Sequence, residues 1–385
     1  MKRKILFIFL ALALLAFPFL TACGEEEVTP TTPTGPTTPT EPEVSYPIQL
    51  TAANYFGAAA SQSKIFDDFC NDLETLTGGL VQCDYYAGST LLDQAAMFDG
   101  VVSGVADIGY SHVYYTPGRM PVTECIGLPL GYTSAWVSGH VMMDFYNEFK
   151  PAEFDDVVVL WMNTSTPSAI STADKPIHTL EDLVGLTLRA PGIAGEVIAA
   201  LGATPAPTPM PEVYDAISKG TLDGEASNFE TLKTFKFADV VKYVTSVWQI
   251  TNPYPFYCVM NKDTYNNLPA DIKVIFDNLV GRYAERSQLM WNAVDWAGRA
   301  YGEQMGVVFS ELTETEAARW GVAVVTVVDN YIAKMVAAGY TEAEVNSWID
   351  FIRERIDYWT TKQIELRIAS AAGPPEVKTE AVLGQ

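Results

Sequence analysis

Strand-like and helical segments alternate in two separate series along the chain, and this pattern limits the possible folds more than any other feature. The first series has strands at 46–53, 80–86 and 105–110, separated by helices at 61–76 and 92–103. The strands alternate apolar and polar residues, whereas the helices place apolar residues three or four positions apart. This alternation favours parallel βαβ units in an α/β fold.

The same alternation returns later with a different sequence. It predicts three further strands and three further helices, at 186–189, 204–207 and 222–226 and at 180–183, 193–201 and 211–218. Strand-like segments at 157–162 and 254–260 join the two series. We therefore expect two lobes connected by crossing hinge strands, with a ligand bound between them.

A helical pattern without proline runs from Ala270 to about Gln304. At 1.5 Å per residue it would reach roughly 50 Å, which is longer than one lobe needs. A chain of 385 residues is also too long for one ordinary core. An amphipathic helix at 342–368 follows, and residues 371–385 are expected to form a loose tail.

The N-terminus has the features of an export signal. Basic residues at 2–4 precede an apolar run at 5–20, and the sequence Leu-Thr-Ala-Cys at 20–23 resembles a bacterial lipobox. We expect residues 1–22 to be a lipoprotein signal peptide and Cys23 to be lipidated; a signal anchor with an incidental cysteine is the alternative. The Thr- and Pro-rich residues 23–45 predict an extended linker. The protein would then be exported and anchored by lipid to the outer face of the cell membrane, either in a periplasm or at an extracellular surface.

The charge balance and the lack of catalytic motifs exclude several function classes. Acidic residues outnumber basic ones by 47 to 24, and the net charge of −23 argues against binding to nucleic acid. Only three histidines occur, and the sequence holds no H-E-x-x-H, G-x-S-x-G or G-x-x-x-x-G-K-[ST] motif. We expect no catalytic residues, no metal and no cofactor. A hydrolase whose catalytic residues meet only in space is the rival hypothesis.

Besides Cys23, the chain has four cysteines, at positions 70, 83, 125 and 258. Outside the cytoplasm they could form up to two disulfides, and free buried thiols are equally compatible with the sequence. None of their spacings matches a zinc site.

Arg189 is the basic residue best placed to bind a ligand. It ends a predicted strand, just before Ala190-Pro191-Gly192 and a helix start. Open α/β sheets bind ligands at the carboxyl ends of their strands. A guanidinium binds a carboxylate through two parallel charge-assisted hydrogen bonds. A surface arginine or an internal ion pair is the alternative.

The residues around Arg189 resemble the DctP-like solute receptors of tripartite ATP-independent periplasmic (TRAP) transporters. Residues 182–192 are similar to the family pattern D-L-x-G-x-x-[IL]-R-x-P, and residues 219–228 resemble its G-x-[VL]-D-G turn with the following Asn. Weaker matches in the expected order lie at 77–79, 88–91, 103–109, 201–205, 212–216, 259–263 and 268–269. The resemblance covers roughly residues 48–327.

The resemblance implies a two-lobed fold like that of type II periplasmic binding proteins, with hinge strands and a long domain-spanning helix. Lobe I would comprise residues 46–162 and 252–295, and lobe II residues 163–251 and 296–370. The receptor would deliver a small organic acid, a carboxylate, to TRAP membrane subunits. A receptor of the same fold that serves an ABC transporter or a sensor kinase is the alternative.

The resemblance further implies that Arg189 clamps the carboxylate and that Asn228 assists. By position, further candidates for the cleft are Tyr55, Phe56, His112, Trp161, Asn163, Tyr214 and Trp248. Dicarboxylate and sialic-acid receptors of the family often carry a second arginine near the segment that is 161–166 here, which has none. We therefore expect a ligand with a single carboxylate.

Overall fold

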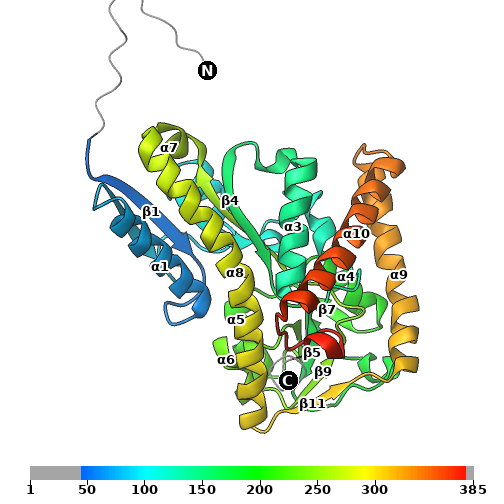
Figure 1. The fold of residues 1–385 in the computed structure, drawn as a ribbon. Coiled ribbons are helices and arrows are strands. Elements are labelled where there is room, and N and C mark those ends of the chain that lie inside the picture. Colours follow the sequence, from blue (N-terminus) through cyan, green and yellow to red (C-terminus); the bar gives the residue numbers. More distant parts are fainter. Residues whose placement is uncertain (1–44, 379–385) are drawn as a thin grey trace, which may run out of the picture. The chain divides into compact units, whose positions relative to one another are not determined.

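The structure is a computed structural model that describes residues 45–378 (Figure 1). The predicted signal peptide at 1–22 and the predicted lipidation site Cys23 lie outside the described residues. So do residues 24–44 of the predicted linker and residues 379–385 of the predicted tail.

One sheet is built from the N-terminal part of the chain and one later strand. Its strands follow the order β2-β1-β3-β10-β4. β1 pairs in parallel with β2 and β3, and β10 runs antiparallel to both β3 and β4. Helices α1 (Ser61–Leu76) and α2 (Met97–Val102) make the crossovers that parallel strands require. The strand bounds are β1 Ile48–Asn54, β2 Val81–Tyr86, β3 Ile108–His112, β4 Val157–Thr164 and β10 Pro255–Asn261.

A second sheet follows the order β11-β9-β5-β8-β6-β7. β6 pairs in parallel with β7 and β8, whereas β5 runs antiparallel to its neighbours β8 and β9. The strand bounds are β5 Ala169–Thr172, β6 Thr187–Arg189, β7 Thr204–Ala206, β8 Gly224–Ser227, β9 Tyr243–Ser246 and β11 Val308–Glu311. The helices between them are α4 Ile193–Ala200, α5 Met210–Ser218 and α6 Thr231–Thr234. The predicted α/β fold with two lobes is confirmed.

The remaining elements complete the body of the molecule. The longer ones are α3 Ala135–Phe149, α7 Lys262–Asn267, α8 Ala270–Gln304, α9 Glu314–Ala337 and α10 Glu342–Leu366. The 3-10 turns are η1 Val113–Tyr115, η2 Thr123–Gly127, η3 Ala152–Phe154, η4 Leu180–Leu183, η5 Phe237–Asp239 and η6 Pro375–Val377.

A disulfide between Cys70 and Cys83 links α1 to β2. The two residues are 13 positions apart, and closing a loop of about that length stabilises the folded state by roughly 3 kcal/mol, mainly through the unfolded chain. Cys125 and Cys258 are buried free thiols. The sequence was compatible with disulfides and with free buried thiols. One pair of cysteines forms a disulfide, and the other two cysteines remain free thiols.

Two chain segments that cross between the sheets, 165–168 and 247–254, are hydrogen-bonded to each other. Ser165 N donates to Tyr254 O at 3.0 Å, and Ser168 N donates to Asn252 O at 3.1 Å. The hydroxyl of Thr251 donates to Ser168 O at 2.6 Å. The segments expected to be hinges, 157–162 and 254–260, lie almost wholly within β4 and β10 of the first sheet, and the paired crossings are the segments next to them.

Helix α8 is the third connection, and it runs along elements of both sheets (Figure 1). Near its middle, Gln288 Nε2 donates to Met162 O of β4 at 2.8 Å. Further along, Asp295 Oδ1 accepts from Asn228 Nδ2, which follows β8, at 3.2 Å. The predicted range of this helix is confirmed, and one rigid helix thus contacts both lobes.

The C-terminal helices pack on both parts of the body. α9 packs on α4, and α10 packs along α3, although we assigned the range of α10 to lobe II. Among the described helices, α9 alone is long and apolar enough to cross a membrane by composition, with a mean hydropathy of 1.3. Its side chains Trp320, Val324 and Val327 are buried against the body.

Residues 371–378 are packed rather than loose, unlike the tail that we predicted. Ala371, Ala372 and Val377 are buried, and Ser370 N donates to Val377 O at 2.8 Å. The sequence did not reveal this packing because alanines and a single valine carry no clear periodicity.

Gly298 lets α8 approach the loop between β8 and α6. A Cβ atom at this position would lie 2.2 Å from Phe229 O and 2.6 Å from Glu230 Cα. No side chain fits there without moving the backbone of the loop that carries Asn228 and Glu230.

Replacing Gly298 with Ala should therefore lower the free energy of unfolding by about 1–3 kcal/mol, because the new methyl group overlaps backbone atoms. Urea denaturation measures the change. Gly281 lies on the same helix, and its Cβ would meet nothing within 4 Å. Gly281→Ala should stabilise the protein by about 0.5–1 kcal/mol. Equal losses at both positions would contradict the explanation by close approach.

Candidate functional site

A small cavity lies where the two sheets face each other. Its lining comes from residues at or next to the ends of β1, β3, β4, β6, β8 and β10, from the two residues that flank α6, and from η1, α5 and α8. The lining residues are Tyr55, Phe56, His112, Tyr115, Ser165, Arg189, Met210, Ser227, Asn228, Glu230, Phe235, Tyr254, Phe256 and Trp291. Aromatic rings therefore dominate the wall, and polar groups occur at a few points, as is usual in sites for small molecules.

Arg189 is the cation of this cavity. It ends β6 and is only 1% exposed. Its Nε donates to Thr208 O at 3.1 Å, which fixes the plane of the guanidinium. Among residues 45–378, no carboxylate lies within ion-pair distance of it. Its terminal nitrogens are therefore available to an anion.

Glu225 lies beside Arg189 in the neighbouring strand. The two residues are direct partners in the parallel β6–β8 register, so their side chains leave the same face of the sheet. Burial raises the pKa of Glu225 to about 7, against the opposing effects of a hydrogen bond from Thr231 and the charge of Arg189. Glu225 therefore changes its charge next to Arg189 near neutral pH.

His112 contributes a neutral hydrogen-bond donor. Its Nδ1 accepts from Tyr114 N at 2.9 Å, so the proton of the neutral ring lies on Nε2. Nε2 is buried and has no hydrogen-bond partner among the described residues. Burial, and secondarily the charge of Arg189, hold the pKa of His112 well below its usual value.

Tyr254 connects the histidine and the arginine. Its ring lies 5.1 Å from that of His112, and the Arg189 guanidinium carbon lies 5.4 Å above the Tyr254 ring. The Tyr254 hydroxyl donates to Ala226 O, which anchors this ring to β8. Three side chains from β3, β6 and the hinge region thus converge at one point of the wall.

Two buried carboxyl groups, Glu230 before α6 and Asp295 on α8, lie close to the start of α6. Asp295 Oδ1 accepts from Asn228 Nδ2 at 3.2 Å and from Glu230 N at 3.1 Å. Burial is the largest cause that raises the pKa of Asp295 to about 6 and that of Glu230 to about 8. Glu230 is therefore mainly protonated near pH 7, which reduces the cost of burying it.

The cavity is almost filled by its own side chains. The remaining space is about 20 Å³, enough for about one water molecule. An adjoining open groove of about 720 Å³ shares Tyr55 and Phe235 with the cavity and reaches Gly88 and Glu212. A molecule much larger than one water therefore does not fit the cavity as it stands in this structure.

Five of the nine residues predicted to bind ligand line the cavity, namely Tyr55, Phe56, His112, Arg189 and Asn228. The other four do not. Trp161 is buried in the core, with its ring 5.5 Å from Phe66 and 5.6 Å from Phe69. Asn163 lies one layer behind the wall and donates from Nδ2 to the Tyr110 hydroxyl at 3.0 Å. Tyr214 on α5 and Trp248 after β9 pack partly buried against the core of the second lobe.

The site prediction omitted much of the aromatic wall, its one carboxyl residue Glu230, and Glu225 beside Arg189. Phe256 and Trp291 stack with centroids 4.9 Å apart, although they come from β10 and α8. Glu225 was quoted only as part of a motif. The sequence signal that could have found them is weak: apolar or acidic residues at the end of a strand or on the inner face of a helix.

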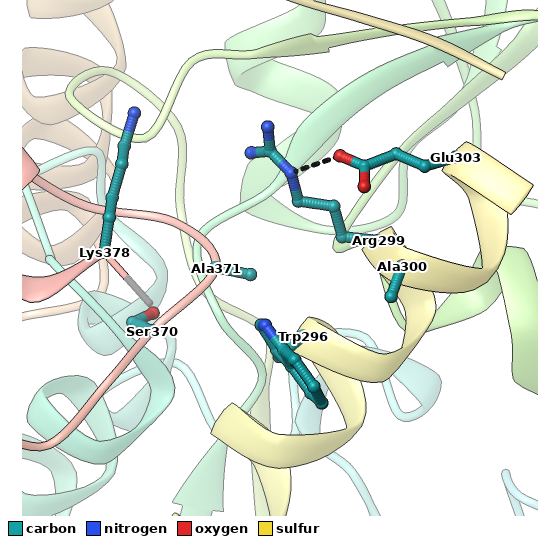
Figure 2. Close-up of a pocket in the computed structure, with 7 residues that line it drawn as sticks. All are labelled: Trp296, Arg299, Ala300, Glu303, Ser370, Ala371 and Lys378. Carbon is teal, nitrogen blue, oxygen red and sulfur yellow. Dashed lines mark hydrogen bonds and ion pairs between the residues drawn. The ribbon is translucent and has the colours of Figure 1, made fainter. Parts of the chain in front are cut away.

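A second hollow beside the C-terminal half of α8 is a weaker candidate (Figure 2). Its arginine, Arg299, is already paired, since its Nε lies 3.1 Å from Glu303 Oε1 one turn along the helix. The Arg299 guanidinium also lies over the ring of Phe309, at 5.2 Å. Within residues 45–378, no cluster of three or more His, Cys, Asp or Glu could hold a metal ion.

Comparison with known proteins agrees with this geometry. A sialic acid-binding periplasmic protein from Vibrio cholerae is 26% identical over 227 residues, which are 55% of this chain and 67% of that protein. A TRAP periplasmic solute-binding protein from Desulfovibrio salexigens is 32% identical, with a TM-score of 0.70, covering 80% of this chain and 96% of that one. A TRAP solute-binding protein from Rhodoferax ferrireducens, in complex with copurified benzoate, is 25% identical with a TM-score of 0.76, covering 82% and 99%.

The family model for DctP, described as bacterial extracellular solute-binding protein, family 7, matches residues 53–335. The match spans well over half of the chain and confirms the resemblance seen in the motifs around Arg189. The chain therefore belongs to the DctP family of bacterial extracellular solute-binding proteins.

Proposed function

We propose that this protein captures a small organic acid with one carboxylate and an aromatic or other flat apolar part, and delivers it to TRAP membrane subunits. The observation that carries the proposal is a buried arginine without an ion-pair partner in a cavity walled by aromatic rings. A buried charge is costly unless it is paired, so the cavity favours an anion.

The carboxylate would bind to Arg189 through two parallel hydrogen bonds from the guanidinium. His112 Nε2 would donate a further bond, since it is buried and lacks a partner. Asn228, fixed by its bond to Asp295, would help to position the acid. Water lost when the lobes close would thus be replaced by rigid donors.

The aromatic wall favours a ligand with a flat apolar part. Phe56, Phe256 and Trp291 pack together with ring centroids 4.9–6.1 Å apart, and a ligand ring can take up similar offset geometry. Arg189 is the only basic side chain other than His112 in the described lining. One carboxylate is therefore favoured over two, and the benzoate held by the Rhodoferax relative has one.

We infer that the protein acts as a receptor rather than as an enzyme, because the cavity supplies binding groups and no paired nucleophile and base. We also propose that lipid attached to Cys23 anchors the body to the outer face of the membrane. The linker at 23–45 would give the body reach toward the membrane subunits.

Arg189→Ala should weaken carboxylate binding by about 30-fold or more. The reason is that the ligand charge would be buried without its partner, a loss of roughly 2–5 kcal/mol. Calorimetric titration with a panel of aromatic and aliphatic monocarboxylates and dicarboxylates measures it. The control is Arg299→Ala, which removes the paired arginine of the second hollow and should leave the affinity unchanged. Tightest binding of a dicarboxylate, or binding that survives Arg189→Ala, would contradict the proposal.

Affinity for a monocarboxylate should fall as the pH rises from 6 to 8.5. The ligand, with a pKa near 4, is ionised throughout this range. Glu225 loses its proton as the pH passes its folded-state value of about 7, and its negative charge then competes for Arg189. Glu225→Gln should make the pH profile of the dissociation constant, measured by calorimetry, less steep around pH 7, whereas the ionisation of Glu230, whose pKa is about 8, remains. A profile that stays equally steep in this variant would assign the effect to another group.

A further inference from the structure

The cavity lining includes one carboxyl group, Glu230, that carboxylate binding at Arg189 does not use. Glu230 immediately precedes α6, lines the cavity and is only 3% exposed. Its Oε2 is buried and has no hydrogen-bond partner within residues 45–378, although Thr234 and Gln62 lie close enough to the carboxyl group to oppose the rise in its pKa that burial causes. Most buried polar atoms in proteins are hydrogen-bonded, so this oxygen needs an explanation.

The neighbouring carboxyl groups of Glu225 and Asp295 each also keep one buried oxygen without a partner, but neither residue lines the cavity. Glu225 Oε1 accepts from the Thr231 hydroxyl at 2.6 Å. Asp295 Oδ1 accepts two hydrogen bonds, one of them from the backbone N–H of Glu230 itself. These two carboxyls support the local fold. The Glu230 backbone takes part in that support, and its side chain is the one of the three that lines the cavity, where a ligand can reach it.

The position of Glu230 suits contact with the same ligand that Arg189 holds. Arg189 comes from the end of β6, and Glu230 from the loop that α8 fixes through Asp295. Both residues line the same cavity, and Tyr55 is part of that lining with them. Tyr55 in turn stacks on Phe56 with centroids 4.3 Å apart.

We propose that Glu230 accepts a hydrogen bond from a hydroxyl or amino substituent of the bound acid. The preferred ligand is then an aromatic monocarboxylate that carries such a donor on its ring. This inference rests on the proposed function and adds the residue that selects among aromatic acids. A ligand without the donor would leave the buried carboxyl unpaired, which is how sites of this kind reject close analogues.

The full-length protein tests the inference without any substitution. Calorimetry compares benzoate with its 2-, 3- and 4-hydroxy forms and with the matching fluoro forms, which are similar in size but donate no hydrogen bond. We expect one hydroxybenzoate to bind at least about tenfold more tightly than benzoate and than its fluoro counterpart.

Two substitutions then assign the effect to the carboxyl group. Glu230→Leu should abolish the preference for hydroxyl over fluorine while benzoate binding remains. Glu230→Gln keeps the size and an acceptor oxygen, so it should retain part of the preference; it also serves if the leucine variant does not fold. Glu303→Gln, in the second hollow, is the control and should keep the wild-type preference.

The outcomes separate this inference from the function on which it rests. If benzoate binds and depends on Arg189, but hydroxyl and fluoro forms bind equally, the role of Glu230 is overturned and the receptor function stands. A hydroxyl preference that persists in Glu230→Leu also overturns it. If no aromatic acid binds at all, the proposed function itself fails.

Discussion

The burial of one guanidinium is the constraint on which the rest of this structure depends. Arginine keeps its charge in proteins, and a charge inside a protein is costly without a counter-charge. The chain gives Arg189 one backbone acceptor, a tyrosine face and a carboxyl group whose pKa is about 7. None of these is a full anionic partner at neutral pH. The arrangement is therefore suited to an anion that arrives from outside, and two lobes provide the means to enclose it.

Helix α8 holds together parts of the site that come from both sheets. Hydrogen bonds to Asp295 hold the loop with Asn228 and Glu230 against this helix. Gly298 allows this close approach because it has no side chain. Tyr55 and Phe56 follow β1 of the other sheet. The same helix also contacts this second group, because the ring of Trp291 lies 6.1 Å from that of Phe56. One helix thus positions side chains that come from both sheets.

The sequence predicted the long elements well and the short polar ones poorly. The helices at 61–76 and 270–304 have the predicted ends, because one apolar face repeats without interruption. Strands β5 and β9 have four residues each and include Ser and Thr, so alternation is barely visible. Helix α9 leaves Val322 and Val325 exposed, which weakens its helical pattern.

The same limits apply to the site. Arg189 could be predicted because it is a basic residue at a strand end in an acidic chain. The aromatic wall could not, since Trp161 in the core and Phe256 in the cavity both lie on strands that are buried on both faces. Glu230 is one of 47 acidic residues, and only the three-dimensional structure shows which of them are buried. Burial depends on how the whole chain packs, so it cannot be recognised from a single sequence position.

The link between Cys70 and Cys83 has a consequence for how the protein is made. It joins the first helix to the second strand, so it crosslinks the first strand–helix–strand unit of the described chain. Disulfides of this kind form in oxidising compartments and not in the bacterial cytoplasm. A member of an extracellular receptor family is thus completed only on the side of the membrane where it works. Material produced in a reducing cytoplasm would carry two thiols in place of this crosslink, and its first lobe would be the part that differs.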